Sequence, residues 1–155
     1  METQQVTADL KLVKTPPNIC FKIDEICFSE RCYQRIADAE KIYGEVYAYR
    51  DTLDRVIGYI VYGQVWIEAD DTNAYISRIG VLPAYRRRGH AAQMLHRIET
   101  ELRERNCPAI HADIREDNTA SRSLFEKSGY APIWEDDALF DGYKAIRYAK
   151  PLGIQ

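Results

Sequence analysis

Three consecutive arginines, Arg86, Arg87 and Arg88, stand directly before Gly89 and a segment with helical periodicity. Cations in the first turn of a helix oppose the helix dipole, which is unfavourable by itself. An anion docked at this turn would offset the cost, because free N–H groups point out of a helix start. Gly89 and the small Ala91 let the backbone come close to such an anion. The pattern is typical of a phosphate site, and a solvated basic turn beside a core helix is the alternative.

The residues on either side of the arginines indicate a strand–loop–helix unit. Residues 75–81 are rich in β-branched and aromatic side chains, which favours a strand, and Pro83 ends it because proline has no N–H for the ladder. After the loop, apolar residues recur at helical spacing between charged ones: Ala91, Met94, Leu95, Ile98 and Leu102. The arginines would therefore lie between the end of a strand and the start of a helix.

The order of the expected elements indicates an α+β fold. Strands are expected at 9–13, 45–50, 56–66, 74–82, 109–114, 130–134 and 143–149, and helices at 19–27, 30–39, 89–105 and 118–128. Short polar turns between the early strands predict an antiparallel meander, whereas the later strand–helix–strand unit favours a parallel pair with a right-handed crossover. We expect three layers, α/β/α, around a mixed sheet, in a single domain over residues 1–155 of which 1–8 are flexible.

Two further segments carry expectations about the acceptor side of the molecule. The helix at 19–27 is expected to turn Ile19, Ile23, Ile26 and Cys27 to one face. Between them, this helix and the one at 30–39 would carry Phe28, Tyr33 and Ile36, which form either a wall of a substrate groove or plain core packing. Residues 135–142 are expected to form an acidic loop that attracts cationic acceptors of any kind.

Composition excludes several classes of protein. The net charge of −3 and the pI near 5.7 leave no basic footprint for a nucleic acid. No apolar run approaches the ~20 residues that would span a bilayer, and residues 1–5 lack the basic and apolar regions of a signal peptide. The cysteines have neither Cys-x-x-Cys nor zinc-site spacing, which predicts free thiols, no metal and a cytoplasmic location: Cys20, Cys27, Cys32 and Cys107.

Two motifs resemble those of a known family. Arg86-x-x-Gly89-x-Ala91, preceded by Val81-x-Pro83-x-Tyr85, is similar to the acyl-CoA pyrophosphate loop of the GNAT N-acetyltransferases. Asn118-x-Ala120-x3-Leu124-Phe125-Glu126-Lys127-Ser128-Gly129-Tyr130 resembles the family's second signature, and residues 145–152 resemble the last strand of RimI-type protein N-terminal acetyltransferases. The resemblance covers nearly all of the chain. It implies a mixed, mostly antiparallel sheet with a splayed central pair of parallel strands.

The resemblance also implies a reaction and a cofactor site. Members of the family move an acetyl group from acetyl-CoA to a primary amine directly, without a covalent enzyme intermediate. The residues that correspond to the family's cofactor site are Ile79, Gly80, Val81, Arg86, Arg87, Arg88, Gly89, His90, Ala91 and Asn118. The backbone of residues 79–81 would pair with the pantetheine arm. Asn118 can cap a helix as well as contact the cofactor, and His90, which is usually aliphatic in relatives, can simply pack at the helix start.

Tyr75 and Asp113 stand where members of the family place catalytic bases, on strands that should lie side by side. Each has a structural alternative. Tyr75 is one of eleven tyrosines and can pack on the sheet, and Asp113 can pair with Arg115 or His111. His111 is expected on the same side of its strand as Asp113, further from the splayed end.

The residue that would protonate the leaving thiolate departs from the family pattern. Many GNAT enzymes carry a tyrosine where this chain has Phe125, which has no proton to give. A CoA thiolate leaves fairly well without an acid, and otherwise water or Tyr130 can serve.

The acceptor is expected to be a protein or peptide α-amine. An α-amino group has a pKa near 8, so about a tenth is neutral at pH 7, whereas a lysine side chain near 10.4 is neutral in less than about one part in a thousand. An α-amine therefore needs only a modest base. Lysine, a small amine such as a polyamine or antibiotic, and a non-catalytic acyl-CoA-binding module are the alternatives. We expect no nucleic-acid or membrane partner, and a monomer or homodimer.

Overall fold

The computed structural model describes residues 11–27, 45–64, 73–140 and 143–153. Within these ranges seven strands form one sheet: β1 (Lys11–Lys14), β2 (Glu45–Arg50), β3 (Val56–Gln64), β4 (Ala74–Val81), β5 (Ala109–Arg115), β6 (Ala131–Phe140) and β7 (Tyr143–Pro151). The helices are α1 (Phe21–Cys27), α3 (His90–Glu104) and α4 (Thr119–Lys127), with short 3₁₀ turns η2 (Pro17–Cys20) and η3 (Pro83–Tyr85). The helix expected at 30–39, with Phe28, Tyr33 and Ile36, lies outside the described residues.

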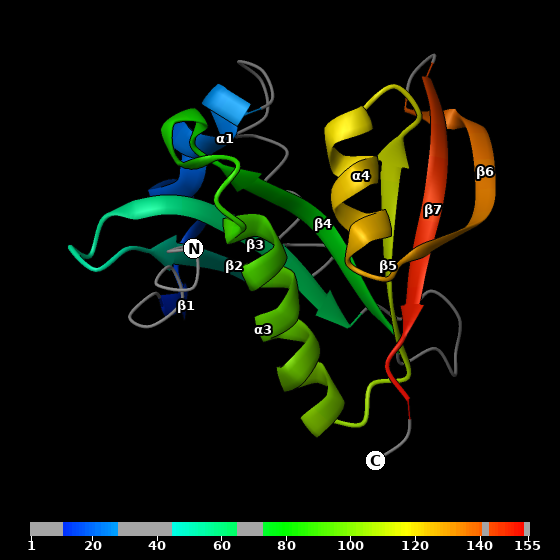
Figure 1. Ribbon diagram of the computed structural model, residues 1–155, viewed down its shortest axis with the longest axis horizontal. Helices are drawn as coiled ribbons and strands as arrows, with labels where there is room; N and C mark the ends of the chain where they lie inside the picture. The colour runs from blue at the N-terminus through cyan, green and yellow to red at the C-terminus, as the bar shows by residue number, and fades with distance from the viewer. Residues whose placement is uncertain (1–10, 28–44, 65–72, 141–142, 154–155) are drawn as a thin grey trace.

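The sheet has the order β1-β2-β3-β4-β5-β7-β6, and its neighbours are antiparallel except β4 and β5. Those two strands pair in parallel from Ala74↔Ile110 to Ile76↔Ala112. Beyond this point they diverge into a V, with α3 in front of one arm and α4 in front of the other (Figure 1). The expected mixed sheet with a splayed parallel pair is confirmed.

A β-bulge marks the point of divergence. The β3–β4 register passes from Tyr62↔Ile76 to Val61↔Arg78, which leaves Ser77 without an opposite residue. A bulge bends its strand and increases the local twist, which is consistent with β4 turning away from β5 here. The Ser77 Oγ is buried and has no hydrogen-bond partner among the described residues. A buried polar atom of this kind is rare in a folded protein.

Two clusters of apolar side chains give the expected three layers. The larger lies between the sheet and α3 with α4, and it buries the predicted helical stripe of Met94, Leu95, Ile98 and Leu102. The smaller lies on the other face, where α1 contacts β3 and β4. The helices of the described ranges are all too short or too polar to cross a membrane.

The expected buried face of α1 is partly wrong. Cys20, Ile23 and Cys27 belong to the smaller core, whereas Ile19 and Ile26 are 42% and 51% exposed. Ile19 departs from the face because it lies in the 3₁₀ turn η2, which has three residues per turn rather than 3.6, whereas Ile26 lies within α1 at the exposed edge of the face formed by Ile23 and Cys27.

The prediction of an acidic loop at residues 135–142 is wrong for residues 135–140. Residues 135–140 continue strand β6, and Glu135 and Asp136 pair with Ile146 and Ala145 of β7. The acidic side chains of this segment do not favour a strand by themselves. The segment is a strand because its backbone pairs with β7. The register is irregular between Asp136 and Phe140.

Candidate active site

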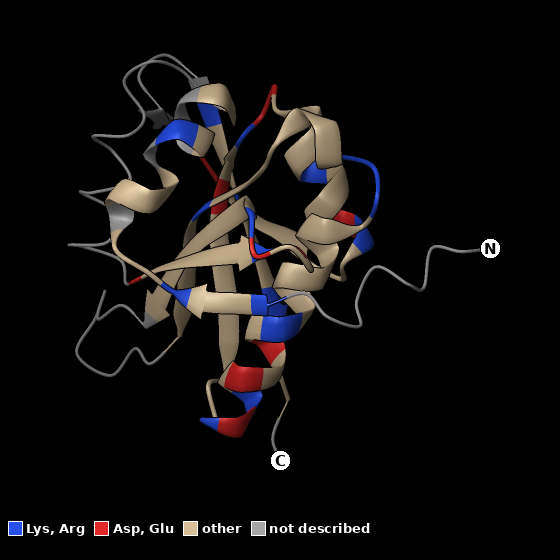
Figure 2. Cartoon of the chain, turned by 90° about the vertical axis from the view of Figure 1, so that its left-hand side faces the viewer, with Lys and Arg blue, Asp and Glu red and all other residues tan. Residues whose placement is uncertain are grey.

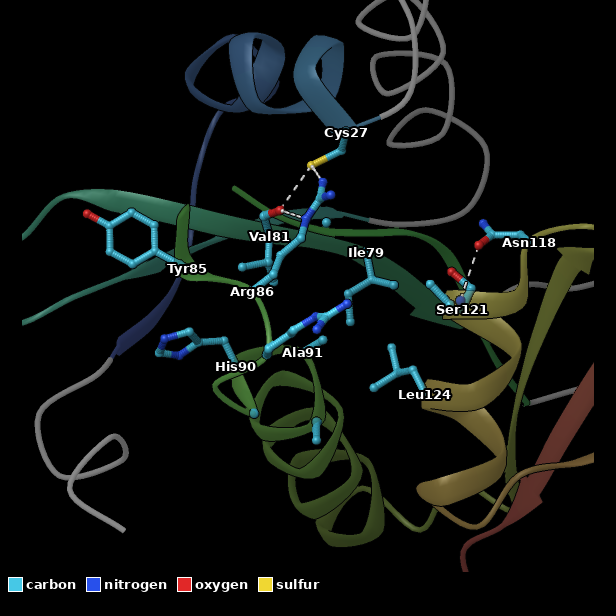
Figure 3. A pocket seen from close by; sticks show the side chains of 15 residues that line it. Cys27, Ile79, Val81, Tyr85, Arg86, His90, Ala91, Asn118, Ser121 and Leu124 are labelled. Carbon is cyan, nitrogen blue, oxygen red and sulfur yellow. Dashed lines mark hydrogen bonds between the residues drawn. The ribbon is translucent and has the colours of Figure 1, made fainter. Parts of the chain in front are cut away.

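A cavity of about 610 Å³ lies between the end of β4, the start of α3 and the start of α4 (Figure 3). Nine of the ten residues expected to contact a cofactor line it: Ile79, Gly80, Val81, Arg86, Arg87, Gly89, His90, Ala91 and Asn118. Arg88 is the exception. The sequence positions are thus brought together in one cavity, and their contact with a cofactor stays a prediction.

The start of α3 is open to an anion. The first hydrogen bond of the helix runs from the Gln93 N–H to the Gly89 carbonyl at 3.0 Å, so the N–H groups of residues 90–92 have no acceptor within the helix. Gly89 precedes the helix at φ +82° and has no side chain to cap it. No acidic residue occupies the first turn, and the charged residues of α3 lie toward its other end, with both signs side by side (Figure 2). Donors and dipole together form an anion-binding helix start.

The three arginines of the loop have different roles. The Arg86 Nε donates to the Val81 carbonyl at 2.8 Å and its Nη2 lies 3.5 Å from the Cys27 Sγ, so this side chain braces the loop against β4 and α1 (Figure 3). The Arg88 guanidinium lies over the Tyr85 ring, 5.8 Å from its centroid, outside the cavity. Arg87 lines the cavity and adopts φ +64°, a left-handed conformation that helps to turn the loop.

Asn118 caps the helix on the far side of the cavity. Its Oδ1 accepts a hydrogen bond from the Ser121 N–H at 3.1 Å, which satisfies one free donor at the start of α4 (Figure 3). The expected capping role is therefore confirmed. This bond uses the oxygen alone, so the amide NH₂ can still donate to a ligand.

His90 belongs more to the core than to the cavity. Its side chain is buried at the edge of the cavity, its Nδ1 lies 3.4 Å from the Tyr49 hydroxyl, and the ring packs against that of Tyr85, which also lines the cavity (Figure 3). Burial, and secondarily the charge of Arg88, lower the pKa of His90 below its ordinary value. Packing at the helix start, the structural alternative for this residue, is what the side chain does.

Tyr75 and Asp113 meet on neighbouring strands. The Tyr75 hydroxyl donates to the Asp113 Oδ2. The same carboxylate accepts from Arg147 of β7, at 2.7 Å from Nε to Oδ1 and 2.9 Å from Nη2 to Oδ2. Arg115, an expected partner of Asp113, instead pairs with Asp117. We call Tyr75, Asp113 and Arg147 the Tyr75 cluster.

Trp134 completes the surroundings of the cluster. The Arg147 guanidinium lies 4.8 Å from the Trp134 ring centroid and 5.8 Å from that of Tyr75. The bond to Asp113 raises the pKa of Arg147 above its ordinary value. Sequence reasoning missed both Arg147 and Trp134, because their contact depends on the β6–β7 register, in which they are opposite each other.

The Tyr75 cluster lies on the face of the sheet opposite α3 and α4. Ile76, Ala112 and Tyr148 are in the larger core under those helices. Side chains alternate along a strand, so Tyr75, Asp113 and Arg147, the respective neighbours of these residues, point to the other face. The cluster and the cavity thus flank the same opening between β4 and β5 from two sides.

Phe125 and Tyr130 are core residues. Phe125 packs edge-on against Tyr130, with ring centroids 4.9 Å apart, and the Tyr130 hydroxyl donates to the Glu99 Oε2 at 2.9 Å. Burial, helped by Glu99, raises the pKa of Tyr130 far above its ordinary value. Neither side chain lines the cavity, so Tyr130 is not placed to protonate a leaving thiolate.

The described cysteines Cys20, Cys27 and Cys107 are free thiols. In the described part of the chain, no three His, Cys, Asp or Glu side chains gather as a metal site requires.

Residues 15–130 match the model of the Acetyltransferase (GNAT) family. The chain belongs to this family. An acetyltransferase of Pectobacterium atrosepticum is 42% identical over 55 residues, which are 36% of this chain and 39% of that protein. The matched part thus spans under half the length of this curated relative.

Solved structures share the fold. The ribosomal-protein-S18-alanine N-acetyltransferase of Escherichia coli superposes with a TM-score of 0.76 at 18% identity, over 94% of this chain and 96% of that one. A putative streptothricin acetyltransferase of Bacillus anthracis, solved with acetyl coenzyme A, gives 0.61 at 24% identity, over 69% and 61%. Because one name specifies a ribosomal protein and the other streptothricin, the shared fold does not decide the acceptor.

Proposed function

We propose that the protein is an acetyl-CoA-dependent N-acetyltransferase whose acceptor is the α-amine of a protein or peptide. The observation that carries the proposal is the uncapped start of α3, which opens into a cavity beside the diverging strands β4 and β5. Phosphates would bind at the free N–H groups of residues 90–92, with Arg87 beside them. Family membership supports the same reaction.

The two sides of the opening suit the two substrates. Beyond Ile76, the edge of β4 that faces β5 is no longer paired with it, so the backbone of residues 79–81 is available to the pantetheine arm. The Asn118 amide can donate to the same ligand from α4. The buried Ser77 hydroxyl, at the bulge where the strands part, is a donor available to the thioester carbonyl. The acceptor amine would approach Tyr75 and Asp113 from the other face.

In the reaction, the amine nitrogen forms a bond to the acetyl carbon while the carbon–sulfur bond breaks. One amine proton is released, and the CoA thiolate takes up one proton. An α-amine makes modest demands, because about a tenth of it is neutral at pH 7. With Phe125 and Tyr130 buried in the core, water is the proton donor for the thiolate. A cytoplasmic location is part of the same proposal.

The first test measures release of free CoA from acetyl-CoA with a pool of peptides that carry free N-termini. A second pool with blocked N-termini and free lysines serves as the comparison. Release with the first pool alone supports the proposal. Release of CoA with both peptide pools indicates lysine as an acceptor. Release with neither pool leaves a small-amine acetyltransferase or a non-catalytic acyl-CoA-binding module.

A matched pair of glycine variants tests the phosphate site. Gly89→Glu should lower acetyl-CoA affinity at least about tenfold, because a carboxylate at the helix start repels and displaces phosphate. Gly153 has the same φ of +82° and, like Gly89, nothing within 4 Å of an added Cβ. Gly153→Glu therefore carries the same backbone strain away from the cavity and should bind normally in calorimetry. Normal binding by Gly89→Glu would exclude the phosphate site.

A further inference from the structure

The Tyr75 cluster assigns a role to a residue outside both family motifs. We propose that Arg147 is a positioning residue for acetyl transfer: it holds Asp113 so that Asp113 orients the Tyr75 hydroxyl toward the acceptor amine. The proposal rests on the proposed function and adds how its acceptor side is organised. Tyr75 is then the catalytic residue of the three, because it is the group that meets the amine.

The Asp113 carboxylate is fully engaged. Both of its oxygens accept from the Arg147 fork, at 2.7 and 2.9 Å, and Oδ2 also accepts from the Tyr75 hydroxyl. The side chain is 3% exposed, so a bound acceptor cannot contact it directly. These charge-assisted bonds fix the carboxylate in one place, which suits Asp113 to holding a neighbouring side chain.

Arg147 is itself held in place. Its guanidinium lies between the rings of Trp134 and Tyr75, at 4.8 and 5.8 Å from their centroids. Cation–π contacts on both sides and a two-point bond to Asp113 leave the fork little freedom. A lysine would supply the charge without the fork, since its ammonium is a single point. The planar guanidinium is therefore what fixes the plane of the carboxylate.

The consequence falls on Tyr75. Its hydroxyl hydrogen points to Asp113, which fixes the orientation of the phenol oxygen, the group that would accept an N–H from the amine. Tyr75 is half-buried and lies near the start of β4, one residue before the pairing with β5 ends at Ile76. A neutral amine held there keeps its own lone pair free for the acetyl carbon. As the nitrogen–carbon bond forms and the carbon–sulfur bond breaks, the amine proton passes to the thiolate through water.

A double-mutant cycle tests the proposal, with Arg147→Met, Tyr75→Phe and both changes together. We expect Arg147→Met to lower kcat/KM for a free-N-terminus peptide about tenfold, no more than the loss of the Tyr75 hydroxyl itself, with acetyl-CoA affinity within about twofold of wild type. In the Tyr75→Phe background the same change should have little further effect. Arg147→Lys should restore less than about a tenth of the lost activity, whereas added guanidinium ion should partly rescue Arg147→Met.

The matched control is Lys150→Met, which removes another β7 cation from a buried carboxylate of nearly equal exposure. It should lower the melting temperature as Arg147→Met does, and leave kcat/KM of the folded protein unchanged. Unchanged kcat/KM in Arg147→Met, or losses that simply add in the double mutant, would overturn the role of Arg147 while the proposed function stands. If wild type binds acetyl-CoA but acetylates neither peptide pool, the proposed α-amine function fails and the positioning role with it.

Discussion

Two clusters on opposite faces of the sheet are built from the same groups. Each joins a tyrosine hydroxyl, a buried carboxylate and a cation from β7: Tyr75, Asp113 and Arg147 in the Tyr75 cluster, and Tyr130, Glu99 and Lys150 in what we call the Tyr130 cluster. The side-chain exposures of carboxylate and cation are 3% and 23% in the first and 4% and 22% in the second. Chemical composition and burial alone therefore do not separate a catalytic cluster from a structural one.

The surroundings separate them. In the Tyr130 cluster the tyrosine is 3% exposed and packed on Phe125, and Lys150 also donates to the Ser128 carbonyl at 2.9 Å. That cluster ties α3 to β7 and to the end of α4. The Tyr75 cluster lies beside the opening between β4 and β5, and its neighbour Trp134 is 45% exposed. A carboxylate–tyrosine pair can act on a substrate only where the tyrosine borders space that a substrate can enter.

The largest expected effect is on turnover. Asp113→Ala should lower kcat at least about tenfold, because Tyr75 loses the group that orients it, while acetyl-CoA affinity stays unchanged. Steady-state kinetics with a free-N-terminus peptide and calorimetry with acetyl-CoA measure the two quantities. Unaffected turnover would show that Asp113 takes no part in the reaction and would make the two clusters equally structural.

Glu99→Gln should lower the stability of the protein and leave turnover unchanged, the reverse of Asp113→Ala. Removing one partner of a buried ion pair costs about 3–5 kcal/mol, and we expect about 2–3 kcal/mol of unfolding free energy here because the Lys150 side chain is partly exposed. Denaturant unfolding measures this loss. The kcat of the folded variant should equal that of wild type, and a large fall in kcat without loss of stability would give the Tyr130 cluster a functional role.

The two tyrosines allow a smaller and cleaner comparison, because Phe replaces each hydroxyl without changing the ring. Tyr130→Phe should cost about 1–3 kcal/mol of stability, since a buried Glu99 oxygen loses its donor, and should leave kcat/KM unchanged. Tyr75→Phe should lower kcat/KM about tenfold or more with a smaller loss of stability. Equal kinetic effects in both variants would contradict the division between the clusters.

The smallest expected effect concerns pH. His90 has a lowered pKa in the folded protein, so the unfolded chain binds its proton first and the stability that His90 contributes above about pH 6.5 is lost as the pH falls. One such group changes the unfolding free energy by at most about 1.4 kcal/mol per pH unit. His90→Gln should flatten the dependence between pH 7.5 and 5.5 in denaturant unfolding. An unchanged dependence of the unfolding free energy on pH in His90→Gln would exclude His90 as its source. Neither cluster contains a histidine, so this test is independent of both.

Local signals in the chain determined most of the fold and the cofactor side of the candidate site. Strands, α3 and the loop from Arg86 to Ala91 follow from side-chain periodicity, Pro83 and Gly89, which act within a few residues of one another. The exceptions are instructive. At η2 a change from 3.6 to three residues per turn moved Ile19 out of the expected face, and residues 135–140 became a strand only because β7 lies beside them.

The roles of individual charged side chains depended on the tertiary structure. The sequence by itself determined that Tyr75 and Asp113 stand on strands expected to be neighbours. Only the pairing of β5 and β6 with β7 brought Arg147 onto Asp113 and Trp134 onto Arg147, and only the packing of α3 placed Glu99 and Tyr130 inside the core. The physical reason is that these contacts join residues from 13 positions apart (Trp134 and Arg147) to 51 positions apart, where register and packing, rather than neighbouring residues, decide which groups meet.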